Sequence, residues 1–539
     1  MGEWRRAIVE AIYRQIDATQ SETFTRQALI NDQLTRIVEE VGSVGVTPEQ
    51  TLSRELQELA QEGLIQFLDH KGTYRLTPPI EPGHSEILAK YFIDGYRSLR
   101  AFHIELNLGL NALVGPNGAG KTNFIEFLDF LSTLVARDAS SAVSVSGGVS
   151  RVFSQENNKK SSPKISATIC STASMSRLFD EVEGRTRFRF EYSVDVRFSK
   201  AHSAIYISDE KIKFYALHHK GEPFMHGRYI GAIHIRRRSP SMEVEPIITI
   251  SPKLLTNGVR NPLRYLRRPV GRGVPPRLQR ADTDFIFSVP PGPDESVLTI
   301  RPGRPALEAI RESVSRGRAF NLNPSAARDP DELSKPPMIA ANGAGLSATL
   351  YHMQQLKRGL PSQWNYLFRR YGKETLDTVV EWTRLVLPEL RDVSVSADPH
   401  TGKYLAYLIV DDGEKGLRIP LQAASDGTIK WLALISMIFV RSSSYSIEEP
   451  ENFLHPRMQQ YLISAIRDSI YEGNLLDYFL ISTHSESIIN QLKPEELVIF
   501  DFHRGRTFCR RLQSPESVSN EIDSTGRGLG YFYASNAIS

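Results

Sequence analysis

The chain has 539 residues, of which 40% are hydrophobic and 24% charged, with a formal net charge of +3, a globular composition with room for a large core. The two cysteines, Cys170 and Cys509, lie outside any Cys-x-x-Cys pair, which excludes a cysteine-based metal knuckle and favours a reducing, cytoplasmic setting. The first residues lack the apolar stretch of a signal peptide, and the longest apolar run, Trp431 to Val440, is shorter than the roughly 20 residues that span a bilayer. We therefore expect no membrane partner.

Residues 1–80 predict a small domain of helices that ends in a hairpin. A later helix is predicted to begin at Thr47, a suitable N-cap, with Pro48 at the first helical position. Two short strands follow, from Leu64 to Leu68 and from Thr73 to Leu76. The stretch LSRELQELAQEGLIQFLDHKGTYRL resembles the winged-helix modules attached to some restriction enzymes. Residues 81–87 are predicted to form a linker because Pro82 and Gly83 interrupt regular structure. The buried helical stripes are predicted to be Ile8, Ile12 and Ile16, and Leu52, Leu56 and Leu59.

The strongest motif is GPNGAGKT, which matches the phosphate-binding pattern G-x-x-x-x-G-K-[ST]. An apolar strand, NALV, precedes it and an amphipathic helix follows, as the pattern requires. Its glycines let backbone amides approach phosphates, and the start of the helix adds a favourable dipole. Lys121 is expected to bridge the β- and γ-phosphates, and the Thr122 hydroxyl to bind Mg²⁺. The cofactors predicted are therefore ATP and Mg²⁺, and the nucleotide-binding residues are Gly115, Asn117, Gly118, Gly120, Lys121, Thr122 and Asn123.

A second phosphate-binding turn is predicted at ASDGT, residues 424–428, ahead of an apolar helix. A Ser-x-Gly turn at the start of a helix presents backbone amides to an anion. Ser425, Asp426 and Gly427 are the candidate contacts. An ordinary helix cap is the structural alternative.

Two further segments supply side chains for hydrolysis. In YSIEEPENFLHP, Glu448 is expected to hold Mg²⁺ through water and Glu449 to activate the attacking water, unless the pair belongs to a solvated acidic loop. In FLISTHSESII, His484 follows an apolar run and is placed to reach the γ-phosphate, unless it is a structural histidine. The catalytic candidates are thus Glu449 and His484, and the metal ligands are Thr122 and Glu448.

In this order, these segments resemble the SMC/RecF-like ABC ATPases, particularly the compact bacterial ones related to overcoming-lysogenisation-defect and abortive-infection ATPases. The resemblance spans most of residues 90–495 and includes YFIDGYRSLRAFHIELNLGLNALVGPNGAGKTNFIEFL, LQAASDGTIKWLALI and IEEPENFLHP. It implies an α/β fold: a P-loop NTPase head domain of the ABC type over residues 88–539. An Arg-rich insertion at about 171–335 would interrupt this domain, and the winged-helix domain would precede it.

The resemblance also implies an assembly. Two heads would enclose two ATP molecules, with Ser425 and Gly427 of one copy contacting the γ-phosphate bound by Lys121 of the other. Arg97, in the segment Gly95-Tyr96-Arg97-Ser98, would lie near the nucleotide. The chain departs from the family pattern where Glu448 replaces the usual Asp, where the preceding strand (442–446) is polar, and where only Gln155 is a candidate for the Q-loop.

The predicted partner surfaces carry opposite charge. Residues 236–280 hold ten arginines and Lys253 against Glu243 and Glu245, which makes the Arg236–Arg280 segment the candidate for nucleic acid; a solvated loop is the alternative. The predicted helix at 47–62 has Arg54 against four glutamates, so it would repel phosphates, and a protein contact there is at least as plausible.

From the resemblance, the main functional hypothesis is an ATPase subunit of antiphage defence or DNA surveillance. Its nucleotide-gated dimer or higher homo-oligomer would control a separate effector such as a nuclease. The first alternative is a winged-helix transcriptional regulator or toxin-neutralising module in which the ATPase is a switch. The second is a RecF-like repair clamp that binds DNA junctions or ends. The sequence identifies neither the effector nor its trigger, and it does not say whether hydrolysis activates or restrains that effector.

Overall fold

The computed structural model divides the chain into two compact units, residues 1–85 and residues 86–539 apart from 179–184. Within the second unit it describes 87–154, 163–175, 186–216, 228–241, 247–250, 291–299, 305–360, 364, 372–413, 416–440, 445–471 and 478–535. In the first unit it describes 23–41, 48–61, 65–67, 73–76 and six residues between 4 and 15. No helix in these parts is long and apolar enough to cross a membrane.

The first unit combines helices with a three-stranded antiparallel sheet of order β1-β3-β2. Its small core includes the predicted Ile8, Ile12, Leu52 and Leu56, all nearly inaccessible to solvent. The predicted helix and both strands are present, whereas Thr47 and the side chain of Leu59 lie outside the described part. Assignment of the unit as a winged-helix module stays a prediction. The elements are β1 (Thr23–Thr25), α2 (Arg26–Asp32), α3 (Leu34–Val41), α4 (Pro48–Gln61), β2 (Ile65–Phe67) and β3 (Thr73–Leu76).

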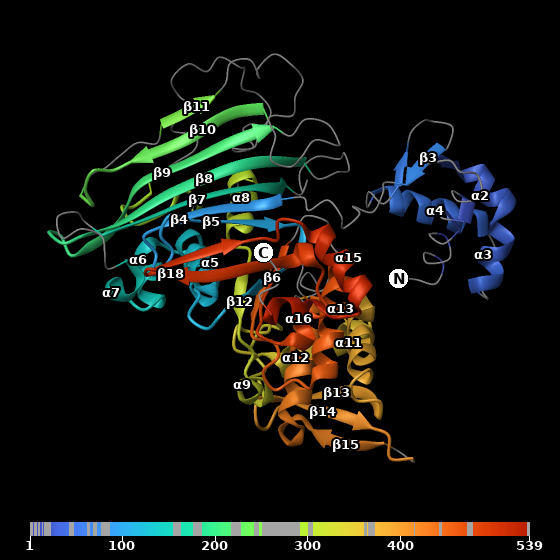
Figure 1. The fold of residues 1–539 in the computed structure, drawn as a ribbon. Helices are drawn as coiled ribbons and strands as arrows, with labels where there is room; N and C mark the ends of the chain where they lie inside the picture. The colour runs from blue at the N-terminus through green and yellow to red at the C-terminus, as the bar shows by residue number, and fades with distance from the viewer. Residues whose placement is uncertain are drawn as a thin grey trace, which may run out of the picture. The chain divides into compact units, whose positions relative to one another are not determined.

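The second unit contains a long antiparallel sheet and a mostly parallel one (Figure 1). The antiparallel sheet has the order β11-β10-β9-β8-β7-β4-β5. Its strands are β4 (Ile87–Asp94), β5 (Phe102–Asn107), β7 (Lys164–Met175), β8 (Thr186–Ser199), β9 (Ala204–Ala216), β10 (Arg228–Arg236) and β11 (Ile247–Ile250). The parallel sheet has the order β12-β16-β17-β6-β18-β19, with only β19 antiparallel to its neighbour. Its strands are β6 (Gly109–Val114), β12 (Arg318–Phe320), β16 (Tyr445–Glu448), β17 (Tyr478–Ser482), β18 (Leu497–His503) and β19 (Arg506–Arg510).

Helices cover these sheets, and a third, smaller sheet adds β13 (Leu390–Asp398), β14 (Lys403–Val410) and β15 (Leu417–Pro420). The helix α12 is buried from Ile429 to Phe439 and, apart from Lys430 and Ser436, apolar over that stretch, as expected for a central core helix. The helices are α5 (Lys121–Ala136), α6 (Ala139–Val145), α7 (Val149–Val152), α8 (Pro305–Val314), α9 (Pro324–Arg328), α10 (Leu346–Lys357), α11 (Thr375–Arg384), α12 (Asp426–Val440), α13 (Pro456–Tyr471), α14 (Glu486–Ile489), α15 (Pro515–Thr525) and α16 (Leu529–Ala534). Short 3-10 turns lie at Val297–Thr299, Gly372–Glu374, Leu421–Ala423 and Pro494–Glu496.

Residues 171–335, expected as an insertion, contribute to both sheets. Strands β8 to β10 continue the antiparallel sheet begun by β4 and β7, and β12 pairs in parallel with β16 beside the predicted site. In β8, residues alternate between the core and the other face, because successive side chains of a strand point to opposite sides. The inward residues are Phe188, Phe190, Tyr192, Val194 and Val196.

The polar segment before Glu448 contains a short buried strand. β16 covers only residues 445–448; Ser442 to Ser444 lie outside the described part. Ser446 is fully buried and its hydroxyl donates to the backbone oxygen of Gly317 at 2.6 Å. Tyr445 packs edge-on against Phe479, with ring centroids 4.7 Å apart. A satisfied hydroxyl is tolerated in a core, which explains a polar residue in this parallel strand.

Candidate nucleotide site

The predicted site residues converge at the carboxyl edge of the parallel sheet, where open α/β sheets bind ligands. The phosphate loop follows β6, Glu448 ends β16, and His484 lies two residues beyond β17. Because these three strands are adjacent and parallel, their ends lie side by side. One pocket is lined by residues 117–123 together with Glu449, Ser482 and His484.

Residues of β18, β19 and α16 pack closely against the phosphate loop. Gly120 caps α5 with φ of 101°, and a Cβ atom there would lie 2.0 Å from the Thr507 hydroxyl. Gly115 lies so close to Phe500 that a Cβ would meet its backbone oxygen at 2.3 Å, and the Gly115 amide hydrogen bonds to Tyr533 of α16. Glycine is therefore required at both positions. Sequence reasoning did not identify Thr507 or Tyr533.

The side chain of Lys121 is buried within the phosphate loop. Its Nζ donates to the backbone oxygens of Gly115 at 2.8 Å and Pro116 at 3.2 Å. Burial lowers the pKa of Lys121, while the nearby carboxylates of Glu449 and Glu451 act in the opposite direction. The carbonyl oxygens accept its hydrogen bonds but do not neutralise its positive charge, so the buried ammonium group can still bind an anion.

Glu448 lies beside the hydroxyl of Thr122. The side chains of Thr122 and Asn321 hydrogen bond to its carboxylate. Burial raises the pKa of Glu448, and the negative charges of Glu449 and Asp129 raise it further. Its Oε1 atom is buried without a hydrogen-bond partner. An unsatisfied carboxylate oxygen in a negative environment suits a cation. Asn321, at the end of β12, was not predicted.

Glu449 is exposed and projects into the pocket from a strained backbone with φ of 42°. Its amide donates to the Ser482 oxygen at 2.9 Å. Its Oε2 accepts from Asn452 Nδ2 at 3.0 Å. A residue other than glycine keeps such a conformation only where the surrounding structure holds it in place.

His484 is fixed by a residue that sequence reasoning missed. Glu451 Oε1 accepts from the His484 amide at 2.8 Å and from the Thr483 hydroxyl at 3.0 Å. Burial is the largest effect on the pKa of His484 and lowers it below the usual 6.5, and the positive charge of Lys121 adds to this. The imidazole is therefore neutral at pH 7 and can accept or donate one hydrogen bond.

Arg97 contacts the loop indirectly. Its guanidinium donates to Asn123 Oδ1 at 3.3 Å and to the Ser146 oxygen at 3.1 Å, and it pairs with Glu126 of α5. Asn123 in turn donates to the Ser98 hydroxyl at 2.7 Å. In this structure Arg97 supports the pocket-lining Asn123 and is not itself a lining residue.

The predicted second phosphate turn lies at the start of α12, outside the pocket lining. Ser425 is exposed, and its Oγ accepts from the Thr428 amide at 3.2 Å, which is a helix cap. Asp426 pairs with Arg328 at 2.5 Å. Gly427 approaches Phe453, where a Cβ would meet the backbone oxygen at 2.8 Å. Within one chain, therefore, this turn and the phosphate loop do not share a pocket.

The structure corrects one part of the Arg-rich prediction. Arg237 is only 3% exposed and donates to the backbone oxygens of Ile207 and Pro291. It is not available to a nucleic acid. Gln155 and the arginines from Arg260 to Arg280 lie outside the described part.

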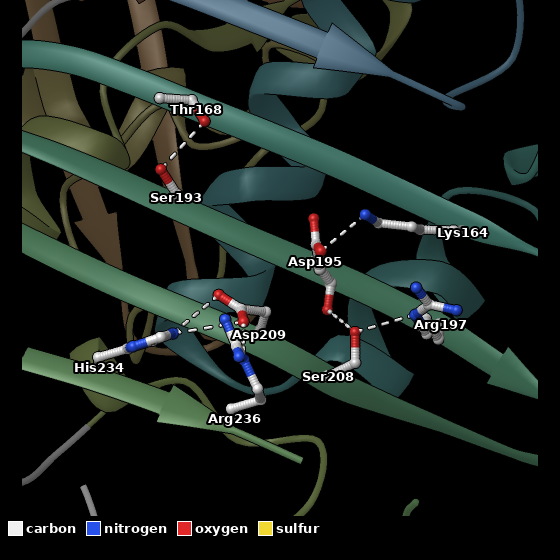
Figure 2. Close-up of polar contacts among 9 residues, drawn as sticks. All are labelled: Lys164, Thr168, Ser193, Asp195, Arg197, Ser208, Asp209, His234 and Arg236. Atoms are coloured by element: carbon white, nitrogen blue, oxygen red, sulfur yellow. Dashed lines mark hydrogen bonds and ion pairs between the residues drawn. The ribbon is translucent and has the colours of Figure 1, made fainter. Parts of the chain in front are cut away.

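The solvent face of the antiparallel sheet carries cross-strand charge pairs (Figure 2). Lys164 pairs with Asp195 at 2.7 Å, and Asp209 accepts from Arg236 at 2.9 Å and contacts His234 at 3.2 Å. Each of the two aspartates therefore offsets the charge of one cation on a neighbouring strand.

Two regions of the chain match known protein families. Residues 92–220 match the model described as "AAA domain", and residues 362–490 match the model described as "AAA domain, putative AbiEii toxin, Type IV TA system". The first region contains the phosphate loop. The second contains the predicted second phosphate turn, the two glutamates and His484.

Solved structures similar to this chain are SMC head domains. One, bound to the C-winged helix domain of ScpA, is 12% identical, covers 80% of this chain and 99% of its own, and has a TM-score of 0.40. A head with an extended coiled coil, bound to the C-terminal domain of ScpA from Pyrococcus furiosus, is 13% identical, covers 82% and 100%, and scores 0.35. The head domain from Thermotoga maritima is 9% identical, covers 79% and 99%, and scores 0.33.

The family matches account for both halves of the site, and the parallel sheet arranges those halves along one edge. The chain therefore contains two regions that match AAA-domain models, the second of which is described as a putative AbiEii toxin of a Type IV TA system.

Proposed function

We propose that the chain binds Mg²⁺-ATP in this pocket and hydrolyses it, with each site completed by a second copy. The observation that carries the proposal is the pocket lining, which joins the phosphate loop to Glu449, Ser482 and His484. A phosphate cradle, a carboxylate and a neutral imidazole in one pocket are the groups that phosphoryl transfer to water requires.

The phosphates would lie along the amides of residues 117–122, at the start of α5. Lys121 would exchange a carbonyl contact for a phosphate oxygen. This exchange is favourable because the pocket desolvates the ammonium group, and a phosphate bears more negative charge than a carbonyl.

Mg²⁺ fits beside Thr122 and Glu448. No cluster of three His, Cys, Asp or Glu side chains suited to a metal occurs among the described residues, but Mg²⁺ usually takes one or two protein ligands plus phosphate and water. The buried, unpartnered Oε1 of Glu448 supports this position. When bound, Mg²⁺ would neutralise phosphate charge during transfer.

Glu449 would orient a water molecule and accept its proton, since its carboxylate is exposed in the pocket and held by Asn452. His484, neutral at pH 7, would contact the γ-phosphate side of the site, with its backbone fixed by Glu451. Ser482 would support both, because its oxygen holds the Glu449 amide.

A second copy would supply Ser425 and Gly427. These residues lie exposed or half-buried at the start of a long helix and outside their own chain's pocket. Such a turn offers amides to an anion, and a symmetric dimer would give each chain's turn to the other chain's ATP. ATP would then stabilise the dimer and hydrolysis would release it.

At the level of the cell, we propose a nucleotide-gated sensor in antiphage defence that controls a separate effector such as a nuclease. The support is the matched model over 362–490, whose description names a putative AbiEii toxin of a Type IV TA system. Control by nucleic acid would depend on the other arginines of the Arg236–Arg280 segment, because Arg237 is buried. A plaque assay with Lys121→Ala tests this role; full protection by the variant would contradict it.

The enzymatic proposal is tested by steady-state ATP turnover of the purified chain, with and without Mg²⁺. We expect Mg²⁺-dependent turnover that Lys121→Ala abolishes, together with weaker ATP binding by that variant. Lys335→Ala is a matched control, because Lys335 is exposed and pairs with Asp331 away from the pocket. Turnover by Lys121→Ala at the wild-type rate would refute the assignment.

A further inference from the structure

One charged side chain of α12 is buried against the catalytic turn. Lys430 is only 1% exposed, although it lies in an otherwise apolar helix. Its Nζ donates to the backbone oxygen of Glu449 at 3.4 Å and lies 5.8 Å from the centroid of the Phe453 ring. Burying an ammonium group is costly unless the surroundings compensate it, so its position requires an explanation.

The compensation comes from the turn that carries Glu449. Burial is the main influence on the pKa of Lys430 and lowers it to about 8, while the carboxylates of Glu451 and Glu449 raise it. The Lys430 ammonium group attracts the carboxylates of Glu449 and Glu451 and donates to the Glu449 backbone oxygen, and these interactions stabilise the turn. Lys430 thus faces the same residues that form the catalytic edge of the pocket.

The turn from Glu449 to Phe453 is strained at both ends, with φ of 42° at Glu449 and 68° at Phe453. Such conformations persist only where neighbouring structure holds them. α12 contacts both ends: Lys430 reaches the Glu449 oxygen, and Gly427 packs against the Phe453 oxygen so closely that no Cβ would fit.

We propose that Lys430 is a positioning residue that keeps Glu449 aimed into the pocket and couples it to the Ser425–Gly427 turn of the same chain. This inference rests on the proposed function, in which that turn contacts the ATP of the second copy. When the turn of one chain contacts the ATP of the second copy, it would also hold Glu449 of its own chain in place, beside that chain's own ATP. The two sites of a dimer would communicate through one helix turn, from Ser425 to Lys430.

The test is steady-state ATP turnover and thermal unfolding of the full chain carrying Lys430→Met, with Lys430→Arg beside it. We expect Lys430→Met to lower kcat about 10- to 100-fold, the usual effect of misplacing a catalytic group, with KM within about twofold. Lys430→Arg should retain part of the lost rate because it keeps the charge. The melting temperature of Lys430→Met should not fall, because an apolar group of similar length removes a buried charge.

A double variant separates positioning from a purely structural role. If Lys430 acts through Glu449, adding Lys430→Met to Glu449→Gln should slow turnover no further than Glu449→Gln alone. Lys335→Met is the matched control and should behave as wild type. If Lys430→Met does not fold, Lys430→Gln replaces it in the same comparison.

Wild-type kcat in Lys430→Met, or full additivity with Glu449→Gln, would overturn the inference. In either case, Mg²⁺-dependent turnover that still requires Glu449 would leave the proposed function standing. Absence of ATP binding and turnover in the wild type would instead contradict the proposed function itself.

Discussion

The two large sheets of the second unit use their strands differently. The parallel sheet presents strand ends: the phosphate loop, Glu448 and His484 follow three adjacent strands, and the pocket forms where they stop. The antiparallel sheet presents a strand face, on which Lys164, Asp195 and Asp209 take part in charge pairs with neighbouring strands (Figure 2). Its other face packs into the core with the helix that begins at the phosphate loop.

From this difference we expect substitutions in one sheet to change ATP turnover and substitutions in the other to change the free energy of unfolding. Edge residues of the parallel sheet carry unsatisfied or strained groups, such as Glu448 Oε1 and the backbone of Glu449. In the described part of the antiparallel sheet, the buried side chains of Ser171, Tyr192 and Glu210 are hydrogen bonded, and Lys164, Asp195, Asp209 and Arg236 form ion pairs on the outer face. Substitutions at the edge should therefore change turnover, whereas those in the antiparallel sheet should change only the free energy of unfolding.

The largest expected effect is on turnover at the parallel edge. Glu449→Gln removes the proton acceptor and should lower kcat by about 10²–10⁴-fold, the usual contribution of a general base. ATP binding should remain, because the phosphate loop is untouched. Glu105→Gln, on β5 and paired with Lys90, is the matched control and should leave kcat unchanged. Equal kcat values for Glu449→Gln and wild type would contradict the expectation that residues at the edge of the parallel sheet determine turnover.

Two adjacent residues of β9 test the two faces of the antiparallel sheet. Glu210 is buried and accepts from Tyr192, Ser296 and the Val297 amide at 2.8, 2.6 and 3.0 Å. Glu210→Ala leaves these donors unpaired and should destabilise the fold by about 3 kcal/mol or more, measured by denaturant unfolding.

Asp209→Ala, on the opposite face of β9, removes only solvent-exposed pairs and should cost at most about 1 kcal/mol. A cost equal to that of Glu210→Ala would show that the outer charge pairs contribute as much as the buried network, against our account.

Alanine substitutions at two glycines separate the cost of a left-handed backbone from the cost of a steric clash. Gly95 and Gly109 share φ values of 87° and 86°, but a Cβ at Gly95 would lie 2.1 Å from the Lys164 oxygen, whereas none of the surroundings approaches Gly109. Gly109→Ala should cost about 1–2 kcal/mol through its left-handed backbone alone. Gly95→Ala should cost roughly 1–3 kcal/mol more, because β7 must move. Equal melting temperatures for the two variants would contradict this.

The smallest expected effect is a pH dependence at His484. Burial and Lys121 lower its pKa below 6.5, so the imidazole is neutral above that pH and becomes charged only as the pH falls further. Below pH 7, where Lys430 with its pKa of about 8 is mostly charged, turnover should be level down to about pH 6.5 and should decline below it. His484→Asn should remove this decline while lowering the plateau. A loss of wild-type activity that begins above pH 7 would assign the titration to another group.

Sequence reasoning located what local motifs encode. The phosphate loop, its strand and helix, and the apolar strand before His484 are contiguous patterns, and the structure has all of them. Arg97 was placed by resemblance, as was the contact of the Ser425 turn with a second copy, and only the structure shows that Arg97 contacts Asn123 and Glu126. The assignment of roles to these residues stays a prediction.

Other features depended on residues distant in sequence. Asn321 reaches Glu448 because β12 pairs with β16, a pairing that no local pattern in the short segment 318–320 indicates. Two signals were present and missed. One was the strict alternation of residues 186–199, which predicts a half-buried strand. The other was the lone charge of Lys430 in an apolar helix.

Mixing two inactive variants shows whether each site is completed by a second copy. Lys121→Ala keeps an intact Ser425 turn, and Ser425→Arg keeps an intact phosphate loop. If the turn acts on the partner's ATP, each mixed dimer contains one complete site, and an equal mixture should recover up to roughly a quarter of wild-type ATP turnover. If the turn serves its own chain's ATP, or no dimer forms, the mixture will be as inactive as its components, and the account will be wrong.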